Sequence, residues 1–171
     1  MPAVENPTFF SEPSYRVEAF GQVAWYDANC MGAVMRNRLR VLVVEDSPIL
    51  RNRIVDDISA LGRFNVVGWA ESQNDAIEAV ATLKPDVVVT DLQLKEGSGV
   101  EVIRQVREKR PSPPPSIVVL TNYATPEYKQ RCFDFGANGF FDKTSEYDEF
   151  LKRLWDAAPE LPRESLRGNG G

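Results

Sequence analysis

The sequence predicts an α/β fold in which a five-stranded parallel sheet is covered by helices on both faces. Five short apolar runs recur along the chain, each followed by a segment with apolar residues at helical spacing. The run Val87–Val89 has no polar alternation, which is typical of a strand buried on both faces of a parallel sheet. Strands and helices that alternate in this way predict right-handed crossovers between parallel strands.

The first two units, over residues 39–83, each join a strand to an amphipathic helix. The strands are Leu39–Val44 and Phe64–Ala70. Ser47 and Ser72 can cap the two helices, because a hydroxyl at that position accepts a hydrogen bond from a free backbone N–H group. The inward faces carry Leu50, Ile54, Ile58 and Leu61 in the first helix, and Ala76, Ile77, Val80 and Leu83 in the second.

The third strand places Asp91 directly after Val87–Val89 and Thr90. Ligand and catalytic sites of open α/β sheets lie at such carboxyl ends, so Asp91 is the first candidate site residue. This run by itself also fits a residue that only starts a turn or caps the next helix. The loop over residues 93–99 contains two glycines, which leave room for a ligand to approach. A third helix then carries Val100, Ile103 and Val106, before a stiff proline-rich connection.

Two further units complete the predicted sheet. They are the strand Ile117–Leu120, the helix from about Pro126 to Phe135, the strand Gly139–Asp142 and the helix from about Glu146 to Trp155. Thr121 follows the fourth strand, and Lys143 follows the fifth. With the strands numbered in chain order, we expect the flavodoxin-like arrangement 2-1-3-4-5, doubly wound by five helices.

Residues 39–156 form the predicted domain, and the two ends of the chain differ from it. Residues 1–38 mix Pro, Phe, Tyr and Trp without a clear period. We expect them to be an N-terminal extension that is flexible or that reflects an over-long translation start, since Met35 is a natural alternative opening. A short strand at 15–20 and a partner-binding arm are alternatives. Residues 157–171, rich in Pro, Gly and charge, are expected to be a disordered tail.

The composition excludes several classes of function. The chain has 171 residues, of which 43% are hydrophobic and 26% charged, and its net charge of −5 argues against direct nucleic-acid binding. Cys30 and Cys132 form neither a disulfide framework nor a zinc site, and the absence of histidine excludes histidine-based catalysis within the chain. No apolar run of membrane-spanning length and no secretory signal are visible. We therefore expect a cytoplasmic protein without membrane insertion.

Polar side chains follow four of the five predicted strands: Glu45 with Asp46, Asp91, Thr121 and Lys143. The carboxyl ends of parallel strands share one edge of the sheet, so these side chains are expected to converge. Three carboxylates repel one another unless a cation lies among them, and Mg²⁺ suits carboxylate and phosphate oxygens. An ionised Asp can accept a phosphoryl group, while Lys and Thr can bind phosphoryl oxygens. The set therefore predicts phosphoryl transfer.

With this spacing, the chain resembles the receiver domain of two-component response regulators over about residues 39–156. The matching positions are the first strand with Glu45 and Asp46, the phospho-acceptor Asp91, the loop glycine Gly99, the switch threonine Thr121, the aromatic Phe140 and the lysine Lys143. The spaced set is specific, whereas each residue alone would carry little information.

The resemblance implies a role for each matched residue. Asp91 accepts a phosphoryl group from a histidine of a sensor kinase or a phosphotransfer protein, and Lys143 and Thr121 hold that group. The aromatic ring of Phe140 changes its rotamer with Thr121, so phosphate shifts a two-state population. The implied cofactor is Mg²⁺, bound by Glu45, Asp46, Asp91 and the backbone carbonyl of Gln93. Such a domain is not an enzyme for an external substrate, since it catalyses only its own phosphorylation and dephosphorylation.

Several positions depart from the family pattern. Thr144 follows Lys143 where the family usually has proline in a cis peptide. A non-proline cis bond costs about 3–4 kcal/mol, so we expect a trans bond here. Lys95 stands where many members have proline. Gln93 and Tyr123 occupy positions that tune the lifetime of the aspartyl phosphate in the family, and we expect Tyr123 to screen the site from water.

Because only a short segment follows the last helix, we expect a stand-alone receiver that signals through a phosphorylation-dependent protein surface. The expected surface is formed by the fourth helix, the fifth strand and the fifth helix, where Tyr128, Phe141 and Tyr147 either contribute or pack in the core. A non-phosphorylated interaction module on the same fold is the main alternative. A phosphatase with an aspartyl intermediate is disfavoured by Gln93, and flavin binding by Glu45–Asp46. The cognate kinase, the downstream partner and dimerisation are left open.

Overall fold

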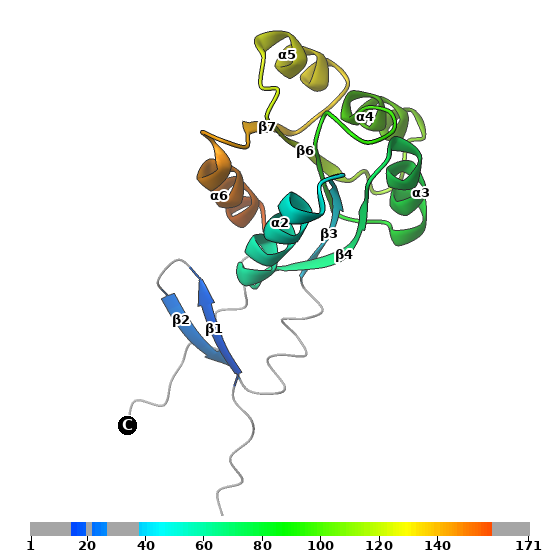
Figure 1. Ribbon diagram of the computed structural model, residues 1–171. Helices are drawn as coiled ribbons and strands as arrows, with labels where there is room; N and C mark the ends of the chain where they lie inside the picture. Colours follow the sequence, from blue (N-terminus) through cyan, green and yellow to red (C-terminus); the bar gives the residue numbers. More distant parts are fainter. Residues whose placement is uncertain (1–14, 20–21, 27–37, 159–171) are drawn as a thin grey trace, which may run out of the picture.

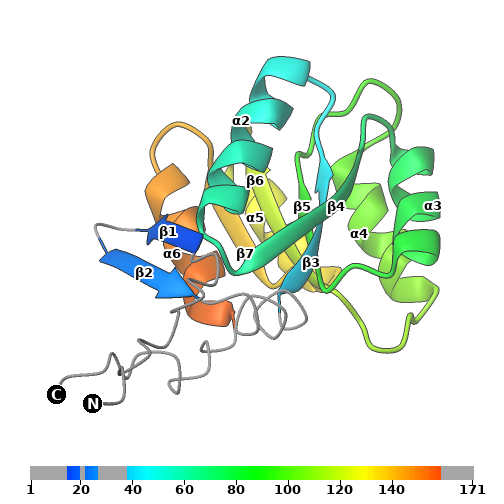
Figure 2. The same ribbon diagram turned by 90° about the horizontal axis from the view of Figure 1, so that it is seen from below.

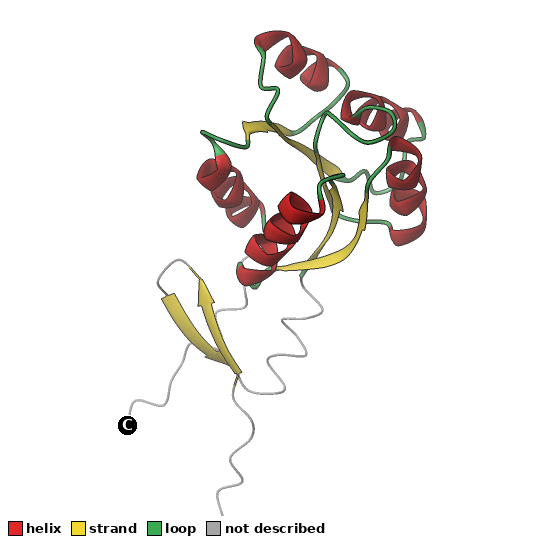
Figure 3. Cartoon of the chain, in the orientation of Figure 1, coloured by secondary structure: helices red, strands yellow, loops and turns green. Residues whose placement is uncertain are grey.

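The computed structural model describes residues 15–19, 22–26 and 38–158 (Figure 1). The strands are β1 (Tyr15–Ala19), β2 (Gln22–Tyr26), β3 (Leu39–Val44), β4 (Phe64–Ala70), β5 (Val87–Thr90), β6 (Ser116–Thr121) and β7 (Gly139–Asp142). The helices are α2 (Pro48–Ala60), α3 (Gln73–Leu83), α4 (Gly99–Glu108), α5 (Pro126–Asp134) and α6 (Tyr147–Ala157). Helices and strands alternate from β3 onward, as Figure 3 shows.

The five strands from β3 onward form one parallel sheet in the order β4-β3-β5-β6-β7. Numbered within this sheet in chain order, they follow the sequence 2-1-3-4-5, which confirms the predicted flavodoxin-like arrangement. Strands β1 and β2 pair with each other as a separate antiparallel sheet. Strand β1 lies within residues 15–20, where a short strand was one of the alternatives. The expectations for residues 1–14, 27–37 and 159–171 lie outside the described residues.

Helices cover both faces of the parallel sheet (Figures 1 and 2). Val41 and Val43 belong to the buried cluster that includes residues of α2 and α6. Leu42 and Val44 belong to the opposite cluster, which includes residues of α3, α4 and α5. Both sets are apolar because successive side chains of a strand point to opposite faces and both faces are covered. This arrangement explains why the strand sequences lack polar alternation.

The face covered by α2 and α6 is packed around Phe150, whose side chain is fully buried. The ring of Phe141 meets Phe150 edge-on, with 6.1 Å between ring centroids, and the ring of Tyr147 lies 5.8 Å from it. The Tyr147 hydroxyl also donates a hydrogen bond of 2.8 Å to Asp57 Oδ2, which joins α6 to α2. Tyr147 and Phe141 therefore pack against the core.

Of the two predicted helix caps, the structure confirms Ser72 at the start of α3 but not Ser47 at the start of α2. The Ser72 hydroxyl accepts a hydrogen bond of 3.2 Å from the backbone N–H of Asp75, as expected for a cap. Ser47 occupies the capping position of α2, but its side chain forms no capping bond, so that prediction was wrong. Its backbone N–H instead donates a 3.2 Å hydrogen bond to Glu45 Oε1, so the buried carboxylate takes part in this turn.

In the described part of the chain, no helix is both long and apolar enough to cross a membrane.

Replacement of Phe150 by Ala is expected to lower the free energy of unfolding by about 3–5 kcal/mol, because it removes a fully buried ring and leaves a cavity. Urea denaturation followed by circular dichroism measures this loss. Phe133→Ala is the matched control, since the Phe133 side chain is 42% exposed, and it should change stability by only about 0.5 kcal/mol. Equal losses in the two variants would contradict the described packing.

Candidate functional site

Three charged side chains from three different strand ends meet at the carboxyl edge of the sheet. Glu45 follows β3, Asp91 follows β5 and Lys143 follows β7. Lys143 Nζ lies 2.5 Å from Glu45 Oε2 and 2.6 Å from Asp91 Oδ2. The side chains of all three are less than one-tenth exposed. One ammonium group therefore bridges two buried carboxylates that are 46 positions apart in the sequence.

Backbone hydrogen bonds extend the sheet by one residue at each of these ends. The N–H of Asp91 donates to the Val44 carbonyl at 3.0 Å, the N–H of Glu45 to Ala70 at 2.9 Å and the N–H of Lys143 to Thr121 at 2.9 Å. The first residue beyond each strand is thus held to a neighbouring strand. This pairing sets where the three side chains leave the sheet.

Burial and charge act in opposite directions on this cluster. Burial raises the pKa of the Glu45 carboxyl above its usual value, although its hydrogen bond to Lys143 partly opposes the increase. For Lys143, burial by itself lowers the pKa of the ammonium group, but the hydrogen bonds to Asp91 and Glu45 raise the pKa overall. The lysine is therefore held in its charged form, which suits a group that neutralises a buried anion.

The Asp91 carboxylate has a defined orientation. Its Oδ1 atom accepts a 2.6 Å hydrogen bond from the N–H of Leu92 and a longer one, 3.4 Å, from Gln93, while Oδ2 faces Lys143. The buried Thr90 hydroxyl donates to the Asp91 backbone carbonyl at 2.8 Å. The turn after β5 therefore presents one carboxylate oxygen to Lys143 and ties the other to the backbone.

The remaining predicted site residues lie at the same edge but are less tightly joined. Asp46 is half-buried and forms no hydrogen bond or ion pair with another described residue. Thr121 is fully buried, and its hydroxyl oxygen accepts a 3.1 Å hydrogen bond from the N–H of Tyr123. Phe140 is 4% exposed and packs in the cluster shared with α3 and α4, with Lys129 Nζ 5.9 Å from its ring centroid.

The donor atoms at this edge suit a small divalent cation. Residues 38–158 contain no group of three carboxylates or thiolates already gathered as a metal site. Glu45 and Asp91, however, direct two carboxylate oxygens at one point, now held by Lys143. Asp46, the residue after Glu45, is half-buried and supplies a third carboxylate close by in the sequence, but it is not gathered with the other two around Lys143. Mg²⁺ is commonly held by one or two carboxylates with water and phosphate oxygens completing its shell. The donor set therefore fits Mg²⁺.

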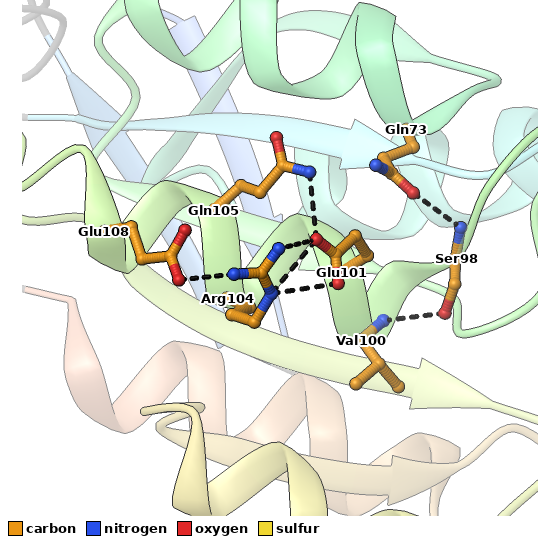
Figure 4. A network of polar contacts seen from close by, with 7 residues as sticks. All are labelled: Gln73, Ser98, Val100, Glu101, Arg104, Gln105 and Glu108. Carbon is orange, nitrogen blue, oxygen red and sulfur yellow. Dashed lines mark hydrogen bonds and ion pairs between the residues drawn. The ribbon is translucent and has the colours of Figure 1, made fainter.

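The loop after Asp91 folds back closely on the site. Gly99 lies so near β5 that a Cβ atom there would be 1.8 Å from the Asp91 carbonyl oxygen, which only glycine avoids. The Gly99 N–H donates to the Leu92 carbonyl at 2.9 Å, and Gln93 pairs with Ser98 across the loop. The Ser98 hydroxyl accepts from the N–H of Val100, which caps α4 (Figure 4). The two ends of the loop over residues 93–98 are thus joined to each other by backbone contacts.

The bond after Lys143 is trans, as the sequence predicts. Among the described residues, the cis peptide bond precedes Pro113, and the Lys143–Thr144 bond is not cis. Asp142 Oδ1 accepts hydrogen bonds from the N–H groups of Thr144 at 2.7 Å and Ser145 at 2.9 Å. A proline at position 144 would lack the first of these donors. Here a carboxylate-capped turn orients the segment that carries Lys143.

A hollow of about 290 Å³ lies between the loop after Asp91 and the two tyrosines that follow Thr121 in the chain. Its lining residues are Leu92, Gln93, Leu94, Gly97, Ser98, Tyr123 and Tyr128. The side chain of Tyr123 is 46% exposed and that of Tyr128 is 40% exposed. The two tyrosines therefore border the solvent side of the hollow next to the candidate site.

Two residues with contacts at this edge were not predicted from the sequence. Thr90 resembles any other β-branched strand residue, and its hydrogen bond to Asp91 has no sequence signature. Gln73 accepts a hydrogen bond of 3.1 Å from Ser98, 25 positions away. Only the packing of α3 against the loop reveals this contact.

Replacement of Lys143 by Met is expected to lower the free energy of unfolding by about 3 kcal/mol near neutral pH, because it leaves two buried carboxylates without a counter-charge. The raised pKa of Glu45 means that its carboxyl binds a proton more tightly in the folded than in the unfolded chain. The deficit should therefore be smaller at acidic than at neutral pH, because protonation removes the negative charge of Glu45.

Urea denaturation at the two pH values measures the effect. Lys152→Met, at an exposed position on α6, is the control and should have little effect at either pH. A loss in Lys143→Met that does not diminish on acidification would contradict this account of the charge cluster.

Comparison with known proteins identifies the family. A family model described as the response regulator receiver domain matches residues 41–155. The chain is 31% identical over 130 residues to the transcriptional regulatory protein YdfI of Bacillus subtilis, a match that covers 76% of this chain and 56% of YdfI. It is 32% identical over 126 residues to a protein-glutamate methylesterase/protein-glutamine glutaminase of Archaeoglobus fulgidus, covering 74% of this chain and 35% of that protein. The chain thus spans about half, or less, of these relatives.

Solved structures agree with this assignment. The signal receiver domain of NarL from Mycobacterium tuberculosis superposes with a TM-score of 0.65 at 29% identity, covering 70% of this chain and 95% of that domain. The response regulator domain of Thermotoga maritima CheB superposes with a TM-score of 0.61 at 24% identity, covering 71% and 99%, which supports the fold alone. Because the family match runs from the first strand of the parallel sheet to its last helix, the chain belongs to the response regulator receiver domain family.

Proposed function

We propose that this protein accepts a phosphoryl group on Asp91 from the phosphohistidine of a sensor kinase or phosphotransfer protein. The observation that carries the proposal is the bridge from Lys143 to both Glu45 and Asp91 at the carboxyl edge of the sheet. A pre-positioned cation next to an ionised carboxylate supplies the two things that phosphoryl transfer requires, positioning and charge neutralisation. Membership of the receiver domain family supports the same chemistry.

In the proposed reaction, Asp91 Oδ2 attacks the phosphorus of phosphohistidine. The new O–P bond forms as the P–N bond breaks, and the electron pair of that bond returns to the imidazole nitrogen. Lys143 Nζ lies 2.6 Å from Oδ2 before the reaction. Its ammonium group then forms an ion pair with a phosphoryl oxygen. The Thr121 hydroxyl donates a hydrogen bond to another phosphoryl oxygen. The bonds from Leu92 and Gln93 to Oδ1 keep the carboxylate oriented throughout.

Receiver domains generally use Mg²⁺, which would neutralise charge on the phosphoryl oxygens. We assign its binding to Glu45, Asp46, Asp91 and the backbone carbonyl of Gln93. The buried Glu45 carboxylate, whose pKa is raised by burial, supports this assignment because a cation would favour its charged form. Lys143 would release Glu45 as it turns toward the phosphoryl group.

We further propose that phosphorylation acts through the pairing of β6 with β7. The Thr121 side chain at the end of β6 would turn toward the phosphoryl group to form a hydrogen bond with it. The ring of Phe140 in β7 would then change its rotamer. The buried ring of Phe140 lies in the cluster that includes Cys132 of α5, so its movement would alter that helix. Tyr123, Tyr128 and Phe133, which are 40–46% exposed in and before α5, offer apolar surface for a downstream protein. A receiver that signals through this surface needs no catalytic output of its own.

The proposed phosphoryl transfer takes place within the receiver domain over residues 39–156. The curated relatives carry names that refer to transcriptional regulation and to protein-glutamate methylesterase activity, and the match covers only part of each. Their outputs are not transferred to this chain. We propose a cytoplasmic receiver that acts without direct nucleic-acid contact and without membrane insertion.

The Asp91→Asn variant is expected to lose phosphorylation completely, because an amide is not a nucleophile. Intact mass is measured after incubation of the full chain with Mg²⁺ and acetyl phosphate. The wild type should gain one phosphoryl group only when Mg²⁺ is present. Asp56→Asn, at an exposed position of α2, should be phosphorylated like the wild type.

The opposite result has a clear meaning. If the folded wild type gains no phosphoryl group, the protein acts as a constitutive interaction module on the same fold. If Asp91→Asn gains the group as the wild type does, another residue is the acceptor.

Replacement of Tyr123 by Ala is expected to shorten the half-life of the phosphorylated protein severalfold, because Tyr123 borders the hollow lined by Leu92 and Gln93, the two residues after Asp91, and would restrict the approach of water. Loss of phosphate is followed by mass after removal of the donor. Tyr128→Ala serves as the comparison, since Tyr128 lines the same hollow from α5, farther along the chain from Thr121. An unchanged half-life in Tyr123→Ala would show that Tyr123 does not restrict the approach of water to the phosphorylated Asp91.

A further inference from the structure

We propose that Gln73, at the start of α3, is a positioning residue for the metal site, because it holds the loop that carries the Gln93 carbonyl. The inference rests on the proposed function, since it concerns the same site. Gln73 contacts none of the reacting groups and acts through the loop alone.

Gln73 forms hydrogen bonds with the loop over residues 93–98 at two positions. Its backbone N–H donates a 2.9 Å hydrogen bond to the Glu96 carbonyl. Its side-chain Oε1 accepts a 3.1 Å hydrogen bond from the N–H of Ser98, which Figure 4 shows. The neighbouring Ser72 pairs with Glu96 as an isolated parallel bridge. Both ends of one short loop segment are therefore attached to the first residue of a helix from another part of the chain.

The glycine between these two points shows how tightly the loop and α3 are packed. Gly97 has φ +85°, a conformation that side-chain-bearing residues rarely adopt. A Cβ atom there would lie 2.4 Å from both Cβ and Oε1 of Gln73. The close approach, and hence the two hydrogen bonds, depends on a glycine at this position.

The attachment is transmitted to the metal site through the loop itself. Ser98, which Gln73 holds, pairs with Gln93 as an antiparallel bridge. Gln93 lies two residues after Asp91, and its N–H reaches Asp91 Oδ1. A shift of Ser98 would therefore move Gln93 relative to the Asp91 carboxylate.

The C-terminal end of the loop is attached to α4, so Gln73 links α3 to α4 through the loop. The Ser98 hydroxyl caps α4 at Val100. In the next turns of α4, Arg104 is paired with Glu101 and Glu108, and Gln105 donates to Glu101 at 3.0 Å (Figure 4). With α4 stiffened in this way and α3 capped by Ser72, the loop is clamped between two helix N-termini.

The test compares variants that keep or remove the acceptor atom of Gln73. Gln73→Met keeps the length of the side chain but lacks the acceptor oxygen, whereas Gln73→Glu keeps an oxygen at the same place. Asn74→Met is the matched control, because Asn74 is exposed on the same turn and its side chain forms no hydrogen bond with a described residue. Two quantities are measured on the full, unphosphorylated chain: the affinity for Mg²⁺ by calorimetric titration, and the hydrogen-exchange rate of the Ser98 amide by NMR.

We expect Gln73→Met to bind Mg²⁺ about tenfold more weakly, in line with the loss of other groups that orient metal ligands, and to exchange the Ser98 amide faster. Gln73→Glu and Asn74→Met should resemble the wild type in both measurements. Rescue by Glu separates the acceptor role from simple packing. If Gln73→Met binds Mg²⁺ as the wild type does, or if Ser98 exchange is unchanged, the inference is wrong. If the wild type itself binds no Mg²⁺, the proposed metal site fails first, and the inference fails with it.

Discussion

The ammonium group of Lys143, shared between Glu45 and Asp91, is the interaction on which the arrangement of the carboxyl edge depends. Carboxylates buried this closely are costly unless a counter-charge lies among them. Lys143 provides that charge from β7, 98 positions from Glu45. The site is therefore complete only when the first, third and fifth strands of the parallel sheet are in register. Lys143 can exchange a carboxylate partner for a phosphoryl oxygen. The ion pair that stabilises the fold is therefore also suited to receive a phosphoryl group.

The sheet makes this arrangement possible because its strands are covered on both faces. The buried apolar clusters on either side leave the strand ends as the place where the sheet carries its polar side chains. Backbone hydrogen bonds continue past the strands at Glu45, Asp91 and Lys143, so each of these residues is held to a neighbouring strand. The reactive side chains are thus attached directly to the hydrogen-bonded sheet.

The loops around the site differ in how they are held. The loop over residues 93–98 is tied to α3 through Gln73 and is closed on itself by Gly99. The segment after Lys143 is turned by Asp142, which accepts two backbone N–H groups. By contrast, the chain after Thr121 is exposed from Asn122 to Thr125. One side of the site is thus held to α3 and α4 by hydrogen bonds, while the other side, next to the exposed aromatic residues of α5, is open to solvent.

The sequence by itself determined the order of the sheet, the bounds of its strands to within a residue or two, and the strand-end positions of Glu45, Asp91, Thr121 and Lys143. It could do so because buried parallel strands are uninterrupted apolar runs, and because polar groups must appear where such strands end. Only the tertiary structure decided that Ser47 does not cap α2, that Tyr147 and Phe141 pack against Phe150, and that Gln73 holds Ser98. These outcomes depend on contacts between residues far apart in the chain, which leave no periodic pattern in the sequence, since a hydrogen bond or ring contact requires only that two side chains meet in space.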